Sequence, residues 1–224
     1  MKLHEQITYQ GYHINIYYDP NPESPREWDN LGTFYTAHRR YQPEEDFDKH
    51  FDIEDVCENG RPGTFRESFL QKYITQNIYM LDHSGQTVST TSFNDPWDSG
   101  WFGMVAVSIE KVKQEYGWRI LTAKRREQIE KYLTGEVETY DMYLRGDVYG
   151  FQITPENDDN NVLDSCWGYF GDENLKHMIT ECKSIIDGYI SQARQDKLKE
   201  IAEKIRKYGQ QLFLPFPDLQ PKIE

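Results

Sequence analysis

Carboxylates crowd into one short stretch of this chain, residues 41–58, where the single lysine or arginine is Lys49. Phe47 and Phe51 recur near helical spacing between the acids. This pattern predicts a short amphipathic helix or compact loop whose apolar edge packs inward while its carboxylates stay in water. The residues predicted to bind a partner are Glu44, Glu45, Asp46, Asp48, Asp52, Glu54 and Asp55.

These carboxylates support two interpretations, and a third has little support. They form either a solvated face that keeps the protein in solution or a phosphate-like array offered to a basic groove. A calcium site is disfavoured, because Asp46, Asp48 and Asp52 lack the Gly and terminal Glu positions of an EF-hand loop.

A second group of reactive residue types is Asp82-His83-Ser84. Neighbouring side chains on a strand point to opposite faces, so this adjacency argues against a hydrolase triad. His83 with Asp82, Asp95, Asp98 or Asp164 offers metal-ligand types, but no H-E-x-x-H or C-x-x-C spacing supports a metal site. The sequence therefore predicts no catalytic residue, metal or cofactor, and a metal-dependent hydrolase or nuclease remains the alternative function.

Tryptophans form a third group, because Trp28, Trp97, Trp101 and Trp167 each adjoin Asp, Ser or Gly. A nearby carboxylate can accept the ring N–H of a packed indole. Two interpretations stay open: buried corners with the ring N–H bonded to Asp or backbone, and a ligand cleft lined by Trp and carboxylates.

Overall composition and charge argue against several classes of protein. The chain has 224 residues with 25 Lys and Arg against 38 Asp and Glu, a net charge of −13, which argues against direct nucleic-acid binding. It has no apolar run of about 20 residues and no signal-peptide core at its start, so no membrane association is expected. Three scattered cysteines disfavour a disulfide framework. These features predict a cytoplasmic protein.

The order of the predicted strands and helices along the chain indicates an α+β fold. We expect an antiparallel or mixed sheet, helices on one face and a long C-terminal helix. Strand patterns concentrate in residues 6–110 and 147–170, and a helix is predicted over 122–144, weakened or divided at Gly135. We expect a core domain over 1–171, a helix over 172–208 and a Pro-rich tail over 209–224.

The last predicted helix is unusually long for a globular protein, and its apolar stripe continues to Ile201 and Ile205. Three outcomes are open for it. It projects from the core, bends near Gly188, or pairs with another chain to form a homo-oligomer.

Several motifs together resemble an uncharacterised family of proteins carried by phages, plasmids and other mobile elements of bacteria and archaea. The resemblance covers roughly residues 17–171. The motifs are SPREWDNLG (24–32), LDHSG (81–85), PWDSG (96–100), GEVETYD (135–141) and DSCWG (164–168). It implies an accessory protein of a mobile element that acts inside a bacterial cell, and it implies no catalytic residue.

Acidity and this resemblance lead to one functional expectation. We expect an inhibitor of a host defence system, of the anti-restriction or anti-CRISPR type, that works by protein–protein binding. Its partner is expected to be the basic groove of a host protein or nuclease complex, occupied by the carboxylates of residues 41–58 in place of nucleic acid.

Overall fold

Two separate sheets form the protein in a computed structural model that describes residues 1–38 and 40–212. The smaller sheet has the strand order β1-β2-β8-β9, and the larger has the order β4-β3-β7-β5-β6. The strands are β1 (Leu3–Tyr9), β2 (Tyr12–Tyr18), β3 (Thr33–Thr36), β4 (Glu45–Asp46), β5 (Tyr73–Asp82), β6 (Gln86–Ser89), β7 (Ser99–Ser108), β8 (Val148–Pro155) and β9 (Asp164–Phe170). The helices are η1 (Pro25–Glu27), α1 (Phe47–His50), α2 (Ile53–Val56), η2 (Glu58–Gly60), α3 (Glu67–Leu70), α4 (Ile109–Tyr116), α5 (Ala123–Arg145) and α6 (Gly171–Leu212). The expected α+β class with a long C-terminal helix is confirmed.

The smaller sheet begins with a hairpin, which the alternating apolar residues on either side of Gln10-Gly11 predict. Gln10 and Gly11 both adopt positive φ, as a two-residue turn of the hairpin type requires. Strand β2 then pairs antiparallel with β8, and β8 with β9. Ile14 and Ile16 are fully buried on the face that α6 covers, so this sheet and α6 share one apolar core.

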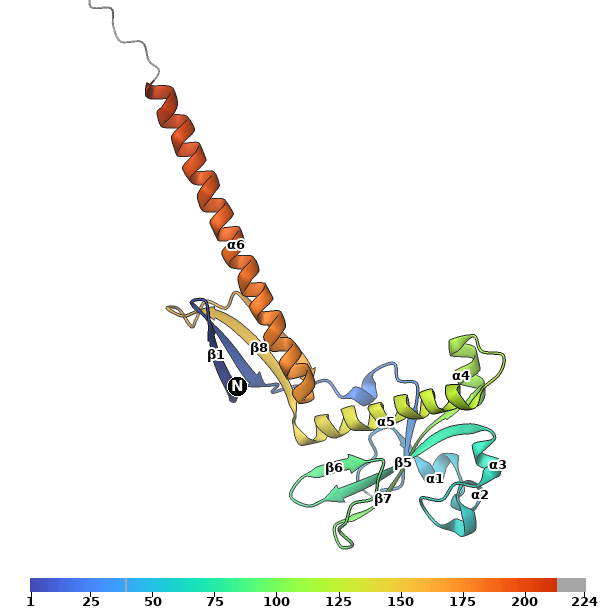
Figure 1. The fold of residues 1–224 in the computed structure, drawn as a ribbon. Helices are drawn as coiled ribbons and strands as arrows, with labels where there is room; N and C mark the ends of the chain where they lie inside the picture. Colours follow the sequence, from blue (N-terminus) through green and yellow to red (C-terminus); the bar gives the residue numbers. More distant parts are fainter. Residues whose placement is uncertain (39, 213–224) are drawn as a thin grey trace, which may run out of the picture.

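The larger sheet carries helices on both faces, as Figure 1 shows. Alternate side chains of its central strand β7 face opposite ways. Val105 and Val107 pack in the core against α5, whereas Met104 and Ala106 pack in the core that includes α1, α2 and α3. The sequence predicted one sheet covered on one face, and the two sheets differ from that arrangement because α5 separates β7 from β8 and directs β8 to the distant hairpin.

Helix α5 runs without interruption through Gly135. The hydroxyl of Thr122 accepts the N–H of Arg125 and caps the start, while Gly146 in the left-handed conformation ends the helix. Apolar residues at helical spacing predict one buried stripe along this helix, and the stripe is confirmed because its residues are at most 2% exposed. They are Ile129, Leu133, Val137 and Tyr140. Burial along this whole stripe outweighs the low helix propensity of one glycine.

Apolar residues at helical spacing over residues 65–74 predict a helix, but the helix in the structure is much shorter. Helix α3 has a single turn, and Tyr73 and Ile74 belong to strand β5. Ile74 pairs with Val107 across the sheet and is fully buried. The β-branched and aromatic residues of this segment gain more from pairing with β7 than from extending the helix.

Helix α6 begins at Gly171, continues through Gly188 and reaches Leu212, so it includes the first residues of the segment expected to be tail. Its first half is buried on the smaller sheet, with Met178, Cys182 and Ile186 fully covered. Its second half extends away from both sheets (Figure 1). The rest of the Pro-rich tail, residues 213–224, lies outside the described residues. Within the described part of the chain, no helix is long and apolar enough to cross a membrane.

Candidate functional site

The acidic segment 41–58 folds as two single-turn helices, α1 and α2, held against the larger sheet. Phe47 and Val56 are each 1% exposed and pack beneath it, and Phe51 contacts the ring of Tyr35 edge-on. This matches the expected apolar edge with carboxylates in water. The burial fixes the backbone that carries the acids.

Two of the predicted partner-binding acids are helix caps. The carboxylate of Asp46 accepts the N–H of Asp48 at 3.2 Å, and that of Asp52 accepts the N–H of Glu54 at 2.8 Å. A helix start leaves N–H groups without partners and carries partial positive charge, so a carboxylate there stabilises the turn. Both carboxylates are therefore used within the fold.

Glu45 and Glu44 also have internal partners. Glu45 lies 2.9 Å from the ring of His50, and both side chains are more than 40% exposed. Glu44 pairs with Arg26 at 2.6 Å, so the acidic segment supplies an internal partner for this arginine. Of the seven predicted residues, Asp48, Glu54 and Asp55 remain, and all three are exposed.

Arg26 is the centre of a buried polar network, with a side chain only 1% exposed. Its guanidinium donates to Glu44, to the carboxylate of Glu136 at 3.2 Å and to the carbonyl of Gly32 at 2.7 Å. It also lies 3.8 Å from the ring centroid of Phe34. A planar guanidinium suits this site, because it donates in several fixed directions while stacking on an aromatic face.

Glu136 connects this network to the loop before β3. Its Oε1 accepts the N–H groups of Leu31 and Gly32, at 2.9 and 3.1 Å, while its Oε2 accepts Arg26. The carboxylate therefore ties helix α5 to the loop that follows η1.

A second tie joins the acidic segment to α5. The hydroxyls of Tyr41 and Tyr140 hydrogen-bond to each other, and Tyr140 is 2% exposed. Burial raises the pKa of Tyr140 above its usual value, because the charged form would lose its hydration. The start of the acidic segment is thus tied to α5 in two ways, by ion pairs through Arg26 and by the direct hydrogen bond of Tyr41 with Tyr140.

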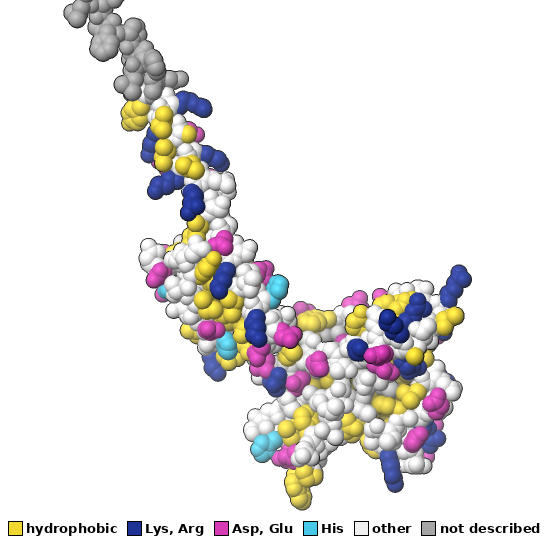
Figure 2. Space-filling model, viewed as in Figure 1, with side chains coloured by type: hydrophobic (Ala, Val, Ile, Leu, Met, Phe, Trp, Pro, Cys, Tyr) yellow, Lys and Arg dark blue, Asp and Glu magenta, His cyan; other side chains and the backbone are white. Residues whose placement is uncertain are grey.

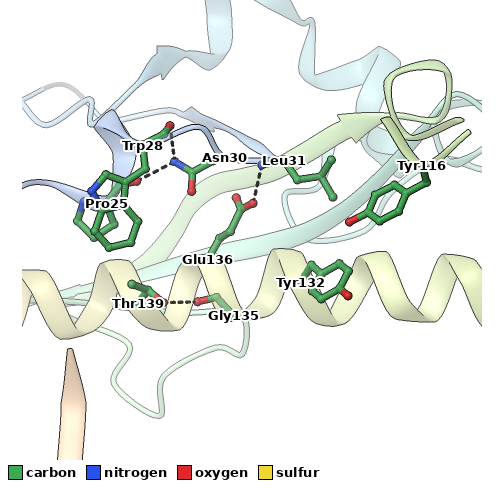
Figure 3. A pocket seen from close by; sticks show the side chains of 9 residues that line it. All are labelled: Pro25, Trp28, Asn30, Leu31, Tyr116, Tyr132, Gly135, Glu136 and Thr139. Atoms are coloured by element: carbon green, nitrogen blue, oxygen red, sulfur yellow. Dashed lines mark hydrogen bonds between the residues drawn. The ribbon is translucent and has the colours of Figure 1, made fainter. Parts of the chain in front are cut away.

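An open pocket of about 370 Å³ lies where η1, α4 and α5 meet. In Figure 3, Pro25 and Trp28 stand on one side of Glu136, and Tyr116 and Tyr132 stand on the other. The three aromatic side chains are between 36% and 47% exposed. This volume lies within the range of small-ligand and side-chain binding pockets.

Several polar groups that line this pocket are hydrogen-bonded within the protein. Asn30 donates to the carbonyls of Pro25 and Trp28, and the hydroxyl of Thr139 donates to the carbonyl of Gly135. Both oxygens of Glu136 already accept hydrogen bonds. The pocket therefore offers mainly ring faces and apolar edges to an occupant.

The residues of the hydrolase alternative are partly brought together. The ring of His83 lies 2.7 Å from the carboxylate of Asp98, and the N–H of Asp82 donates to the carbonyl of Asp98. Asp82 and Asp98 line a pocket of about 450 Å³ with His38. Asp164, however, belongs to β9 of the other sheet.

This end of the larger sheet has the structure of a turn. Asp95 accepts the N–H groups of Trp97 and Asp98, which lowers the pKa of Asp95. Across residues 1–38 and 40–212, no group of three or more His, Cys, Asp and Glu has an arrangement that fits a metal ion. The cluster therefore forms one exposed hydrogen-bonded pair, His83 with Asp98, and a capped turn.

The exposure of the tryptophan side chains tests the two interpretations given for them, buried corners and a ligand cleft. Trp28 is 41% and Trp97 is 91% exposed, so the idea of buried corners is wrong for both. Trp101 does donate its ring N–H, to the side chain of Asn77 at 3.1 Å. Trp28 instead lines the aromatic pocket beside Glu136, as a cleft lined by Trp and carboxylate requires.

Sequence reasoning missed Tyr116 and Tyr132 as parts of a site. The available signal was Gly135, a glycine in the middle of a strong helix pattern, beside Glu136. A Cβ added at Gly135 would meet no atom within 4 Å, so packing does not require glycine there.

Comparisons with known proteins add no relative: the chain matches no protein-family model, and no curated protein or solved structure is significantly similar to it.

Proposed function

We propose that this protein is a binding protein of a mobile element that inhibits a host defence complex, of the restriction or CRISPR type, through protein–protein contact. The observation that carries the proposal is the construction of the acidic segment. Asp48, Glu54 and Asp55 are exposed on two short helices whose backbone is fixed by buried Phe47 and Val56. Fixed carboxylates can occupy a groove that otherwise binds phosphates.

Charge supports the same function. A net charge of −13 speeds association with a basic surface, and salt weakens the attraction because exposed charges are screened within about 8–10 Å. Basic residues of the helices are themselves paired, as in Lys131 with Glu127 and Lys204 with Glu200. Pairing of this kind favours a solvated helix face over a phosphate-binding surface.

The test is charge reversal at the three acids whose side chains have no bonded partner within residues 1–38 and 40–212. The triple variant Asp48→Lys, Glu54→Lys and Asp55→Lys should lose inhibition, because its three outward carboxylates become cations. A matched control reverses three exposed acids elsewhere, Glu110, Glu138 and Glu156, and changes the net charge equally.

The measurement is the plating efficiency of a targeted phage on cells that carry one of a panel of restriction and CRISPR systems. Wild type and the control triple should restore plating on the same strain, and the first triple should not. If the first triple restores plating fully, mimicry of nucleic acid by this segment is wrong. An equal loss in both triples would show that only overall charge matters.

The metal-dependent hydrolase has less support. His83, Asp82 and Asp98 lie together, but Asp164 does not join them and the described residues provide no three-ligand group. A rise in melting temperature on adding Mn²⁺ that is lost in Asp98→Asn would restore it as a candidate.

Self-association through α6 is a second part of the proposal. Leu198, Ile201, Ile205 and Tyr208 form a stripe at coiled-coil spacing and are 45–66% exposed. Figure 2 shows hydrophobic and basic side chains together along this outer half of the helix. A monomeric mass by light scattering at micromolar concentration would contradict self-association.

A further inference from the structure

The aromatic pocket has the chemistry of a site for an apolar segment. Trp28, Tyr116 and Tyr132 present ring faces to solvent, and the Asn30 amide N–H, the Thr139 hydroxyl and the Glu136 carboxylate beside them are bonded internally. An occupant thus gains little from hydrogen bonds and much from contact with the rings. Among the described residues no Lys or Arg lines this pocket, which disfavours a phosphate-bearing ligand.

Gly135 keeps the floor of the pocket open. A glycine inside a helix costs about 1 kcal/mol relative to alanine. Neither a positive φ nor a close approach requires glycine here, because a Cβ would meet nothing within 4 Å. A larger side chain at this position would fill the space between Trp28 and Tyr132.

The chain itself contains a segment of matching chemistry. Residues 213–219 read FLPFPDL, with prolines alternating with large apolar side chains. Proline presets an extended conformation, so such a segment loses little entropy on binding. Grooves lined by aromatic side chains are the usual sites for proline-rich segments.

The reach of the chain decides which copy supplies the segment. Helix α6 has 42 residues and extends about 60 Å at 1.5 Å per residue. It starts beside Met142, at the end of α5, and points away from that helix (Figure 1). The 12 residues after Leu212 span about 40 Å at most, so they do not return to their own pocket.

Charge favours docking between copies. The outer half of α6, residues 192–208, has six basic residues against three acidic ones, while the whole chain carries −13. The basic end that delivers the tail is therefore attracted to the acidic body of another copy. We propose that the pocket beside Gly135 binds the Pro-rich segment 213–219 of a second copy of this chain.

The test measures binding of a labelled peptide, residues 210–224, by fluorescence anisotropy. The receptor is the full chain carrying Phe213→Ser and Phe216→Ser, so that its own tail does not compete. Adding Gly135→Leu should weaken binding at least tenfold. The matched control is Gly188→Leu, because Gly188 is also a helical glycine whose Cβ would meet nothing, but it lies outside the pocket.

Folding does not confound this comparison. Both leucine variants should melt no lower than the receptor, because each replaces a helical glycine in open space. A peptide carrying the same two Phe→Ser changes should bind at least tenfold more weakly than the natural sequence.

Two results would overturn the proposal. One is equal peptide binding with and without Gly135→Leu, and the other is no peptide binding at millimolar concentration. If the peptide fails while Gly135→Leu abolishes phage protection, the pocket serves a foreign partner instead. Because the peptide assay contains no defence component, its outcome is separate from that of the proposed inhibitory function.

Discussion

Carboxylates occupy two contrasting regions of this protein. Around Arg26, the carboxylates of Glu44 and Glu136 are 26% and 14% exposed and accept backbone N–H groups as well as the guanidinium. On the outside of α1 and α2, Asp48, Glu54 and Asp55 face water. The first region fixes the fold, and the second is free to meet a partner. The contrast teaches that acidic density alone does not identify a binding surface.

The largest effect on stability is expected when Arg26 is replaced, because Arg26 is the cation shared by the carboxylates of Glu44 and Glu136. Arg26→Met should lower the free energy of unfolding by about 3–5 kcal/mol, because two poorly hydrated carboxylates lose their common cation. Urea unfolding followed by circular dichroism measures the change. The control Arg40→Met, at an exposed position, should change stability by less than about 0.5 kcal/mol.

Substitutions of the two glutamates that bind Arg26 test whether uncompensated charge causes the loss of stability. Adding Glu44→Gln and Glu136→Gln to Arg26→Met removes the uncompensated charge and should recover part of the loss. If Arg26→Met alone is as stable as wild type, the network does not hold the loop and the acidic segment.

A smaller effect is expected at the neutral tie between Tyr41 and Tyr140. Tyr140→Phe should cost about 1–2 kcal/mol at pH 7, because the hydroxyl of Tyr41 loses its partner. Burial raises the pKa of Tyr140 in the folded protein above its unfolded value. Its stabilising contribution is therefore complete below about pH 10 and is lost as the pH rises further.

The measurement is the melting temperature between pH 8 and 11. Wild type should lose stability above pH 10 more steeply than Tyr140→Phe. Parallel curves for the two proteins would show that Tyr140 does not titrate in this range on unfolding.

The smallest effect separates neighbours within the acidic segment. Asp52→Ala should cost about 1 kcal/mol, because the first turn of α2 loses its cap. Glu54→Ala, at an exposed residue of the same turn, should change stability by less than about 0.5 kcal/mol. Chemical unfolding of both variants checks the pair, and equal losses would remove the distinction between capping and outward acids.

Local features of this fold follow from the sequence. The Gln10-Gly11 turn, the Thr122 cap and the stripe from Ile129 to Tyr140 are encoded by residues close together in the chain, so pattern reasoning predicts them. The division into two sheets was not predictable in this way, because pairing of β2 with β8 depends on segments far apart. Periodicity shows which face of a strand is buried but does not identify the strand beside it.

In the candidate site, too, some features follow from local sequence and others depend on tertiary contacts. The apolar anchor Phe47 and the exposure of Asp48 follow from local spacing. The roles of Glu44 and Glu136 depend on Arg26, a contact that only tertiary structure creates. The aromatic pocket likewise combines Trp28, Tyr116 and Tyr132 from separate elements.

The long-range pairing of β2 also matters while the chain is being made. Tyr18 pairs with Tyr149, so the hairpin emerges from the ribosome long before its neighbouring strand. At about 5–20 residues per second, that interval lasts roughly seven to twenty-six seconds. During this time one edge of the hairpin has no partner, which exposes the nascent protein to aggregation or chaperone binding. Synthesis rate and chaperone supply therefore influence the yield of folded protein more than they would for a fold of local contacts.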